Sequence, residues 1–287
     1  MKKFIVAGML LATTAWLMSF RPAPTPPATL KWYTWEEAVE LSKAKPKKMF
    51  VDVYTDWCGW CKELDKTVYT NRDVQQIADE HFVSVKVDAE KSPEVRSKFN
   101  VRGYPTVVFL TADGRELLRV PGYEPPQLFA ADMRKAVELK GMANHAAELE
   151  ERLESQEGTT EIYAELGYLW RQLGDVVKAR EYLSKARSAG LQSPGLDLDW
   201  VLISRRGPAL VSALEQWLRA NPGSERLAEA SYELGMAQAG LQKWGQAVAA
   251  MDRAAQTSPQ SWWGVRSEYL SKIIRDRYLK TQDDCRT

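Results

Sequence analysis

Residues 49–62 read MFVDVYTDWCGWCK, and this stretch decides the fold. Its first six residues form an apolar run too short for a helix, which predicts a buried strand. Cys58 and Cys61 follow directly, where the chain is expected to enter a helix. Only three cysteines occur in the 287 residues, and a four-residue C-x-x-C loop removes little unfolded-state entropy. The pair is therefore predicted to serve chemistry rather than structural stapling.

The position of the two cysteines predicts different roles for them. Backbone N–H groups and the helix macrodipole stabilise a thiolate at a helix N-terminus, and the thiolate is the attacking species. Cys58 is thus expected to be the exposed nucleophile, and Cys61, one turn further and more buried, to resolve the mixed disulfide. Gly59 permits the tight turn between them. The pair Gly59-Trp60 tunes the redox potential, so the sequence leaves reductase, oxidase and isomerase directions open.

The segments around this stretch predict an α/β unit. Thr34 and Glu37 form a capping box that opens a helix ending before Pro46. The other elements are predicted as strands at 82–87, 106–110 and 116–120, the last two forming a hairpin, and as helices opened by Asn71, by Ser92 and over 126–140. This order predicts a mixed sheet with helices on its faces.

Two motifs carry a resemblance to a known family. Residues 51–62, followed by Thr67-Val68-Tyr69-Thr70-Asn71, resemble the active-site segment of the thioredoxin superfamily, as found in bacterial thiol:disulfide interchange proteins. Arg102-Gly103-Tyr104-Pro105-Thr106 resembles its second signature, with Pro105 placed 44 residues after Cys61. The resemblance covers residues 30–140. It implies an α/β thioredoxin-like fold that exchanges disulfides with other proteins through Cys58 and Cys61, with no cofactor and no metal.

The resemblance also implies supporting residues. Pro105 matches the cis-proline that faces the disulfide, with a trans-proline opening an edge strand as the alternative. Asp52 matches the buried acid beneath Cys61, whose raised pKa would let it accept the Cys61 proton through water. A strand residue facing solvent is the alternative for Asp52. The residues expected to contact substrate are Trp57, Gly59, Trp60, Tyr104 and Gly122.

The sequence departs from the family pattern at two positions. Trp60 stands where proline is common, and the lysine that often accompanies the buried acid falls on Ser84. Asp52 is therefore expected to lack that partner. Trp57 and Trp60 are predicted to form an apolar rim for extended substrates, with packing inside the fold as the alternative for Trp57.

From residue 159 onward the pattern is helical throughout. The spacing of large and small residues resembles a tetratricopeptide repeat and returns 68 residues later, twice the usual 34-residue period. The positions that carry the pattern are Tyr163, Leu166, Gly167, Trp170, Gly174, Ala179, Leu183 and Ala186, then Leu234, Gly235, Ala247, Met251, Ala254 and Pro259, with a weaker copy at Ala213, Trp217 and Ala220.

The repeat spacing predicts a second, all-helical domain. Residues 159–261 would hold three repeats, 262–287 a capping helix with outward charges and a tail, and 141–158 a helical connector. Such repeats bind a protein or peptide. A generic helical bundle is the alternative.

The N-terminus reads as an export signal. Lys2 and Lys3 precede an uncharged run that ends at Phe20, and residues 21–29 form a Pro-rich linker. Residues 1–20 therefore predict export to the periplasm, either as a soluble protein after cleavage or as one held by a retained membrane anchor.

The charge balance and the remaining titratable groups narrow the function. With 39 Lys and Arg against 38 Asp and Glu, nothing favours nucleic acid as a partner. Zinc is a poor alternative for the cysteine pair, because only Cys285, His81 and His145 could complete it. An upstream redox partner and protein disulfide or dithiol substrates are expected. The alternative function is a non-catalytic interaction or chaperone module that uses the thioredoxin fold as a scaffold.

Overall fold

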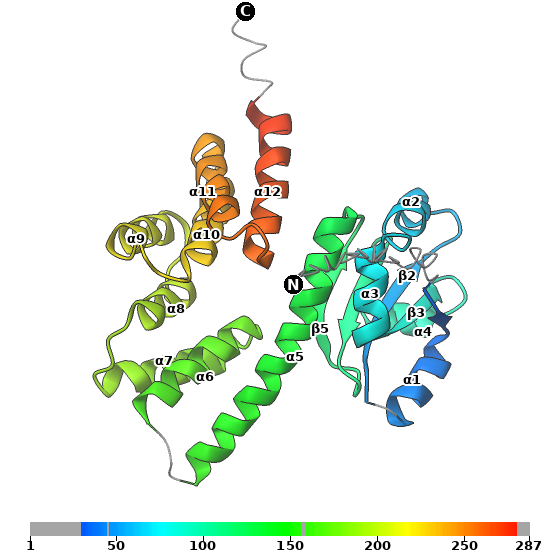
Figure 1. Ribbon diagram of the computed structural model, residues 1–287, viewed down its shortest axis with the longest axis horizontal. Helices are drawn as coiled ribbons and strands as arrows, with labels where there is room; N and C mark the ends of the chain where they lie inside the picture. The colour runs from blue at the N-terminus through cyan, green and yellow to red at the C-terminus, as the bar shows by residue number, and fades with distance from the viewer. Residues whose placement is uncertain (1–29, 45, 156–158, 280–287) are drawn as a thin grey trace, which may run out of the picture.

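A computed structural model of the chain describes residues 30–44, 46–155 and 159–279. It divides into a sheet domain, residues 30–140, and a helical domain, residues 159–279, joined by the long helix α5 (Figure 1). The predicted signal or anchor at 1–20, the linker at 21–29 and Cys285 lie outside the described residues. None of the described helices has the length and apolar composition that crossing a bilayer requires.

The sheet domain contains one five-stranded mixed sheet in the order β1-β3-β2-β4-β5. Strands β1, β3 and β2 run parallel, whereas β4 and β5 run antiparallel to their neighbours. Their bounds are Trp32–Tyr33 (β1), Lys48–Tyr54 (β2), Phe82–Asp88 (β3), Thr106–Leu110 (β4) and Glu116–Pro121 (β5). The four predicted strands are confirmed. The two-residue strand β1 was not predicted, because it is too short to carry a periodic pattern.

Helices cover both faces of the sheet. They are α1 (Trp35–Ala44), α2 (Gly59–Thr67), α3 (Arg72–His81), α4 (Pro93–Lys98) and α5 (Pro126–Glu154). The capping box is confirmed, since Thr34 N–H donates to Glu37 Oε2 at 2.9 Å and Glu37 N–H to Thr34 Oγ1 at 3.2 Å. One core centres on Phe50, Phe109 and Phe129, and the other lies under Val51, Val85 and Val108. Strand β2 contributes to both cores, which explains its apolar run.

Helix α5 is longer than the sequence predicts. A helix ending at residue 140 and a separate connector were expected, but α5 continues without a break to Glu154. Residues 142–154 consist mostly of strong helix formers. Ala146 and Leu149 are buried with Ile162 and Leu166 of the helical domain. The second half of α5 therefore belongs to the packing of that domain.

The helical domain is built from successive helices that pack pairwise, as the all-helical prediction requires. They are α6 (Thr160–Gln172), α7 (Val176–Ser188), α8 (Pro194–Ser204), α9 (Gly207–Ala220), α10 (Leu227–Gly240), α11 (Trp244–Thr257), α12 (Trp262–Ile274) and the π-helix η1 (Arg275–Leu279). A Cβ on Gly167 would lie 2.4 Å from Leu183 Cδ2, and one on Gly235 would lie 2.7 Å from Met251 Cγ. Glycine thus allows close helix approach at two positions 68 residues apart.

The last helix departs from the prediction. Outward charges were expected over 262–280, but Arg266 of α12 makes ion pairs with Glu124 and Asp132 of the sheet domain. The expectation is wrong for Arg266 because α12 packs against α5 (Figure 1), where buried carboxyl groups need a cation.

Candidate active site

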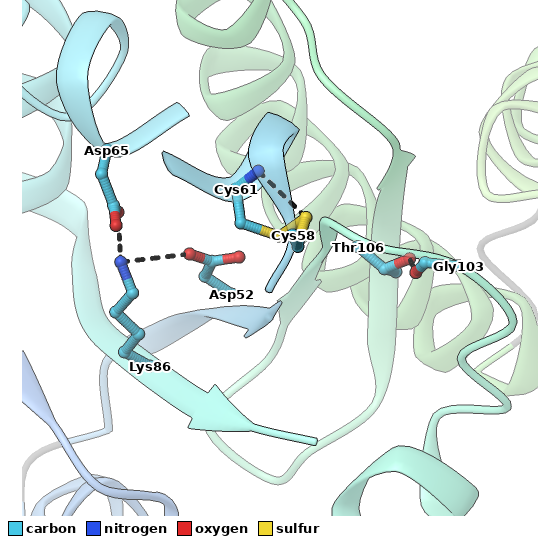
Figure 2. Close-up of a disulfide and its surroundings, with 7 residues drawn as sticks. All are labelled: Asp52, Cys58, Cys61, Asp65, Lys86, Gly103 and Thr106. Atoms are coloured by element: carbon cyan, nitrogen blue, oxygen red, sulfur yellow. Dashed lines mark hydrogen bonds and ion pairs between the residues drawn. A yellow bond between two sulfur atoms is a disulfide. The ribbon is translucent and has the colours of Figure 1, made fainter. Parts of the chain in front are cut away.

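The cysteine pair lies where β2 passes into α2. Cys58 is the N-cap residue of α2, and its Sγ accepts a hydrogen bond from the Cys61 N–H at 3.0 Å. Cys61 lies in the first turn, and the two sulfurs form a disulfide with a Cα–Cα distance of 5.3 Å (Figure 2). This places the Cys58 sulfur at the helix N-terminus, where backbone N–H groups stabilise a thiolate.

The expected difference in exposure between the two cysteines is absent. Cys58 is 5% exposed and Cys61 3%. The expectation that Cys58 is exposed is wrong for this oxidised state, because its sulfur is bonded inward to that of Cys61.

The second signature forms a loop beside the disulfide. The Tyr104–Pro105 peptide bond is cis, as the resemblance implies. Gly103 and Thr106 flank this bond among the surroundings of the disulfide, and Thr106 Oγ1 donates to the Gly103 carbonyl at 2.8 Å (Figure 2). Gly122 N–H donates to the Pro105 carbonyl at 2.8 Å. Gly122 has a φ of 90°, which a side chain would disfavour.

Asp52 lies fully buried on β2, next to the disulfide in Figure 2. The alternative of a solvent-facing strand residue is therefore wrong. Neither carboxyl oxygen has a hydrogen-bond partner among the described residues. Burial raises the pKa of Asp52 to about 7, although the nearby Lys86 opposes that rise. A group with this pKa can exchange a proton near neutral pH.

Lys86 corrects the expectation that Asp52 lacks a lysine. Lys86 Nζ lies 3.7 Å from Asp52 Oδ2 and also contacts Asp65 (Figure 2). The parallel register of β2 and β3 places Lys86 opposite Asp52, whereas Ser84 lies opposite Phe50. The family position pointed to Ser84, two residues from the cation that the sheet brings to Asp52.

Aromatic rings surround this lysine. Its Nζ lies 5.1 Å from the ring centroids of Trp32 and Tyr54 and 5.5 Å from that of Tyr69. These rings stabilise the ammonium group through cation–π attraction. Sequence reasoning missed Lys86, Asp65 and Tyr69. A single lysine inside the apolar run 82–87 was the one signal that pointed to any of them.

Two tryptophans stand exposed around the cysteines. Trp57 is 67% exposed and Trp60 62%. The Trp57 ring meets Tyr104 at a centroid distance of 5.8 Å, and its Nε1 donates to Glu90 at 3.1 Å. Trp60 meets Tyr123 at 5.4 Å. Each tryptophan thus pairs with an aromatic residue next to Pro105 or Gly122.

A cavity of about 520 Å³ adjoins the cis-proline loop. Its lining residues are Asn100, Arg102, Gly103, Tyr104, Thr106, Arg119, Pro121 and Gly122. Within residues 30–44, 46–155 and 159–279, no three His, Cys, Asp or Glu side chains gather closely enough to hold a metal ion.

Comparison with known proteins decides the family. The family model described as "Thioredoxin-like domain" matches residues 35–137. The disulfide bond reductase DsbH of Chlamydia pneumoniae is 31% identical over 115 residues, which are 36% of this chain and 68% of that protein. The chain belongs to the thioredoxin-like family. Its sheet domain is the thioredoxin-like domain, and with the Cys58–Cys61 disulfide the chain is a thiol:disulfide oxidoreductase.

Other relatives match only this domain. The thiol:disulfide interchange protein DsbD of Escherichia coli (strain K12) is 34% identical over 99 residues, 33% of this chain and 18% of that protein. The chain thus spans less than a fifth of that relative. A solved structure of a DsbH oxidoreductase aligns with 46% of this chain and 95% of that chain, at 24% identity and a TM-score of 0.37.

Proposed function

We propose that this thioredoxin-like protein is exported and exchanges disulfides with protein substrates through Cys58 and Cys61, while its helical domain recruits a substrate or partner. The observation that carries the proposal is the Cys58–Cys61 disulfide at the start of α2, beside the buried carboxyl of Asp52. The Chlamydia relative is named a disulfide bond reductase, which favours the reducing direction.

The reducing reaction proceeds in two exchanges. The Cys58 thiolate attacks one sulfur of the substrate disulfide, the substrate S–S bond breaks, and the other substrate sulfur leaves as a thiolate. Cys61 then gives up its proton and attacks the Cys58 sulfur. This step forms the Cys58–Cys61 disulfide and releases the second substrate thiol. Two electrons have passed to the substrate, and a dithiol redox partner reduces the pair again.

Asp52 would assist the second exchange. Its carboxylate accepts the Cys61 proton through water, because a pKa of about 7 makes it a base of suitable strength near neutral pH. Lys86 keeps part of the Asp52 population ionised, since its ammonium group lies 3.7 Å away. Pro105 and Gly122 would form the wall along which the substrate backbone lies.

The exposed tryptophans would bind the substrate chain around its cysteine. Trp57 with Tyr104 and Trp60 with Tyr123 present large apolar surfaces to solvent. Such surfaces suit extended or unfolded segments, whose apolar side chains are accessible.

The helical domain is proposed to be a tetratricopeptide-like array at 159–261, with α12 as its cap. The close approach of Gly167 to Leu183 and of Gly235 to Met251 supports this proposal, because both pairs recur at twice the 34-residue period. Repeat arrays of this kind present extended surfaces that bind proteins or peptides. Export to the periplasm rests on the charged and apolar pattern of residues 1–20.

Turnover of a defined protein disulfide tests the proposal. The purified protein is expected to reduce insulin with dithiothreitol as electron donor, and Cys58→Ser is expected to abolish this turnover. Cys61→Ser should instead accumulate mixed disulfides through Cys58, which mass spectrometry identifies. If the wild type shows neither turnover nor a titratable Cys58–Cys61 disulfide, the protein is a non-catalytic interaction module.

A further inference from the structure

The helical domain reaches the active-site side of the thioredoxin-like domain through one side chain. Arg266 Nη2 lies 3.0 Å from Glu124 Oε1, and Arg266 Nη1 lies 2.5 Å from Asp132 Oδ1. The Trp262 indole N–H donates to the same Asp132 oxygen at 2.7 Å. These contacts join α12 to residues more than 130 positions earlier in the sequence.

Glu124 ends a short segment that touches the active site at two points. Gly122 N–H donates to the carbonyl of Pro105. Tyr123 packs against Trp60, and its hydroxyl hydrogen-bonds to Thr67 Oγ1 of α2 at 3.2 Å. The segment 122–124 therefore connects the cis-proline loop, the tryptophan rim and Arg266.

The contact depends on charge. Asp132 is fully buried and Glu124 is largely buried, and each has one carboxyl oxygen without a hydrogen-bond partner among the described residues. Burial and the neighbouring Asp132 raise the pKa of Glu124 to about 8. Arg266 supplies the cation that both carboxyl groups face. Without it, the two desolvated carboxyl groups would repel each other, and Glu124 would lose its anchor.

We infer that Arg266 is a positioning residue for disulfide exchange: by holding Glu124 it keeps Tyr123 against Trp60 and fixes the substrate-binding rim of the thioredoxin-like domain. This inference rests on the proposed function. It assigns the helical domain a second task besides recruitment, because α12 completes the substrate side of the active site. Arg266 acts on the binding of substrate and leaves the reactivity of the cysteines unchanged.

Three variants separate this role from general stability. Arg266→Gln removes both ion pairs, whereas Arg266→Lys keeps the charge. Arg275→Gln is the matched control, because Arg275 lies on η1 and forms its ion pair with Asp252 inside the helical domain. The measurements are kcat and KM for insulin reduction, the alkylation rate of Cys58 in the reduced protein, and hydrogen–deuterium exchange of a peptide covering 121–124.

For Arg266→Gln we expect KM to rise about five- to tenfold, since the rim residues lose their fixed position. Exchange in the 121–124 peptide should accelerate, and the Cys58 alkylation rate should stay at the wild-type value. Arg266→Lys should restore part of the KM, and Arg275→Gln should match the wild type in all three measurements. If Arg266→Gln fails to fold, Glu124→Gln with Arg266→Lys makes the same comparison.

Unchanged KM and unchanged exchange in folded Arg266→Gln would overturn the inference. A lower alkylation rate would overturn it too, because Arg266 would then act on the cysteines. Failure of the proposed function looks different: the wild type itself would not reduce insulin. The exchange measurement still decides in that case whether Arg266 holds the segment 122–124.

Discussion

Asp52 in the thioredoxin-like domain and Glu229 in the helical domain are both buried acids, yet their surroundings differ. Asp52 has no hydrogen bond to either carboxyl oxygen and a single cation, Lys86, at 3.7 Å. Glu229 accepts hydrogen bonds from Arg171, from Gln172 at 2.9 Å and from Arg226 at 2.8 Å. The same two arginines also bind Asp199.

The two environments shift the acids in opposite directions. Burial raises the pKa of Asp52 to about 7. Burial acts on Glu229 in the same sense, but Arg171 and Arg226 outweigh it and hold its pKa below the ordinary value. A buried carboxyl that is fully paired stays ionised and serves structure, whereas one that is left short of partners can take up and release a proton.

The largest expected effect comes from breaking the paired cluster. Arg226→Met leaves Asp199 and Glu229 with Arg171 alone. We expect this to lower the free energy of unfolding by about 3–5 kcal/mol, because a buried carboxylate loses its partner. Urea unfolding followed by circular dichroism measures it. Arg219→Met on exposed α9 surface is the control, and the Cys58 alkylation rate should not change in either variant.

The next effect comes from removing the unpaired acid. The folded-state pKa of Asp52 lies above its unfolded value, so the folded state binds the extra proton and stability falls as pH rises from about 4 to 7. Asp52→Asn should therefore stabilise the protein by up to about 4 kcal/mol above pH 7, and by nothing near pH 3. It should also slow insulin reduction about a hundredfold. Equal stability of both proteins at pH 8 would contradict this account.

The smallest effect sharpens the comparison by making Asp52 still less paired. Lys86→Met removes the cation that opposes burial, so the pKa of Asp52 should rise further. The pH profile of insulin reduction should then move up by about one unit. Lys91→Met is the matched control, because Lys91 pairs with Asp88 and is largely exposed. A profile that moves equally in both variants would argue against a specific effect of Lys86.

Local sequence signals were sufficient for much of the fold and for the reactive pair. The apolar run 49–54 marks a strand because β2 is buried on both faces. The capping box of Thr34 and Glu37 marks the start of α1, because its two hydrogen bonds join residues three apart. The C-x-x-C spacing marks the disulfide, because the two cysteines lie on one helical turn.

The features that sequence reasoning missed all depend on contacts between distant segments. Lys86 reaches Asp52 through the register of two strands 34 residues apart, and no pattern within either strand fixes that register. Arg266 meets Asp132 across 134 residues. The amphipathic pattern of α12 does not show that its charged side faces another domain. The length of α5 was underestimated because its second half packs against helices that come later in the chain.

Helix α5 takes part in two cores at once. Phe129 and Met133 near its start pack under the sheet, and Ala146 and Leu149 near its end pack against α6. A helix of 29 residues is about 44 Å long, and each residue turns the following one by about 100°. The angular phase between the active site and the helical domain is therefore set by the residue count between Met133 and Ala146. One inserted alanine in that interval would swing the helical domain around the helix axis, so a bound partner would approach the disulfide from another side.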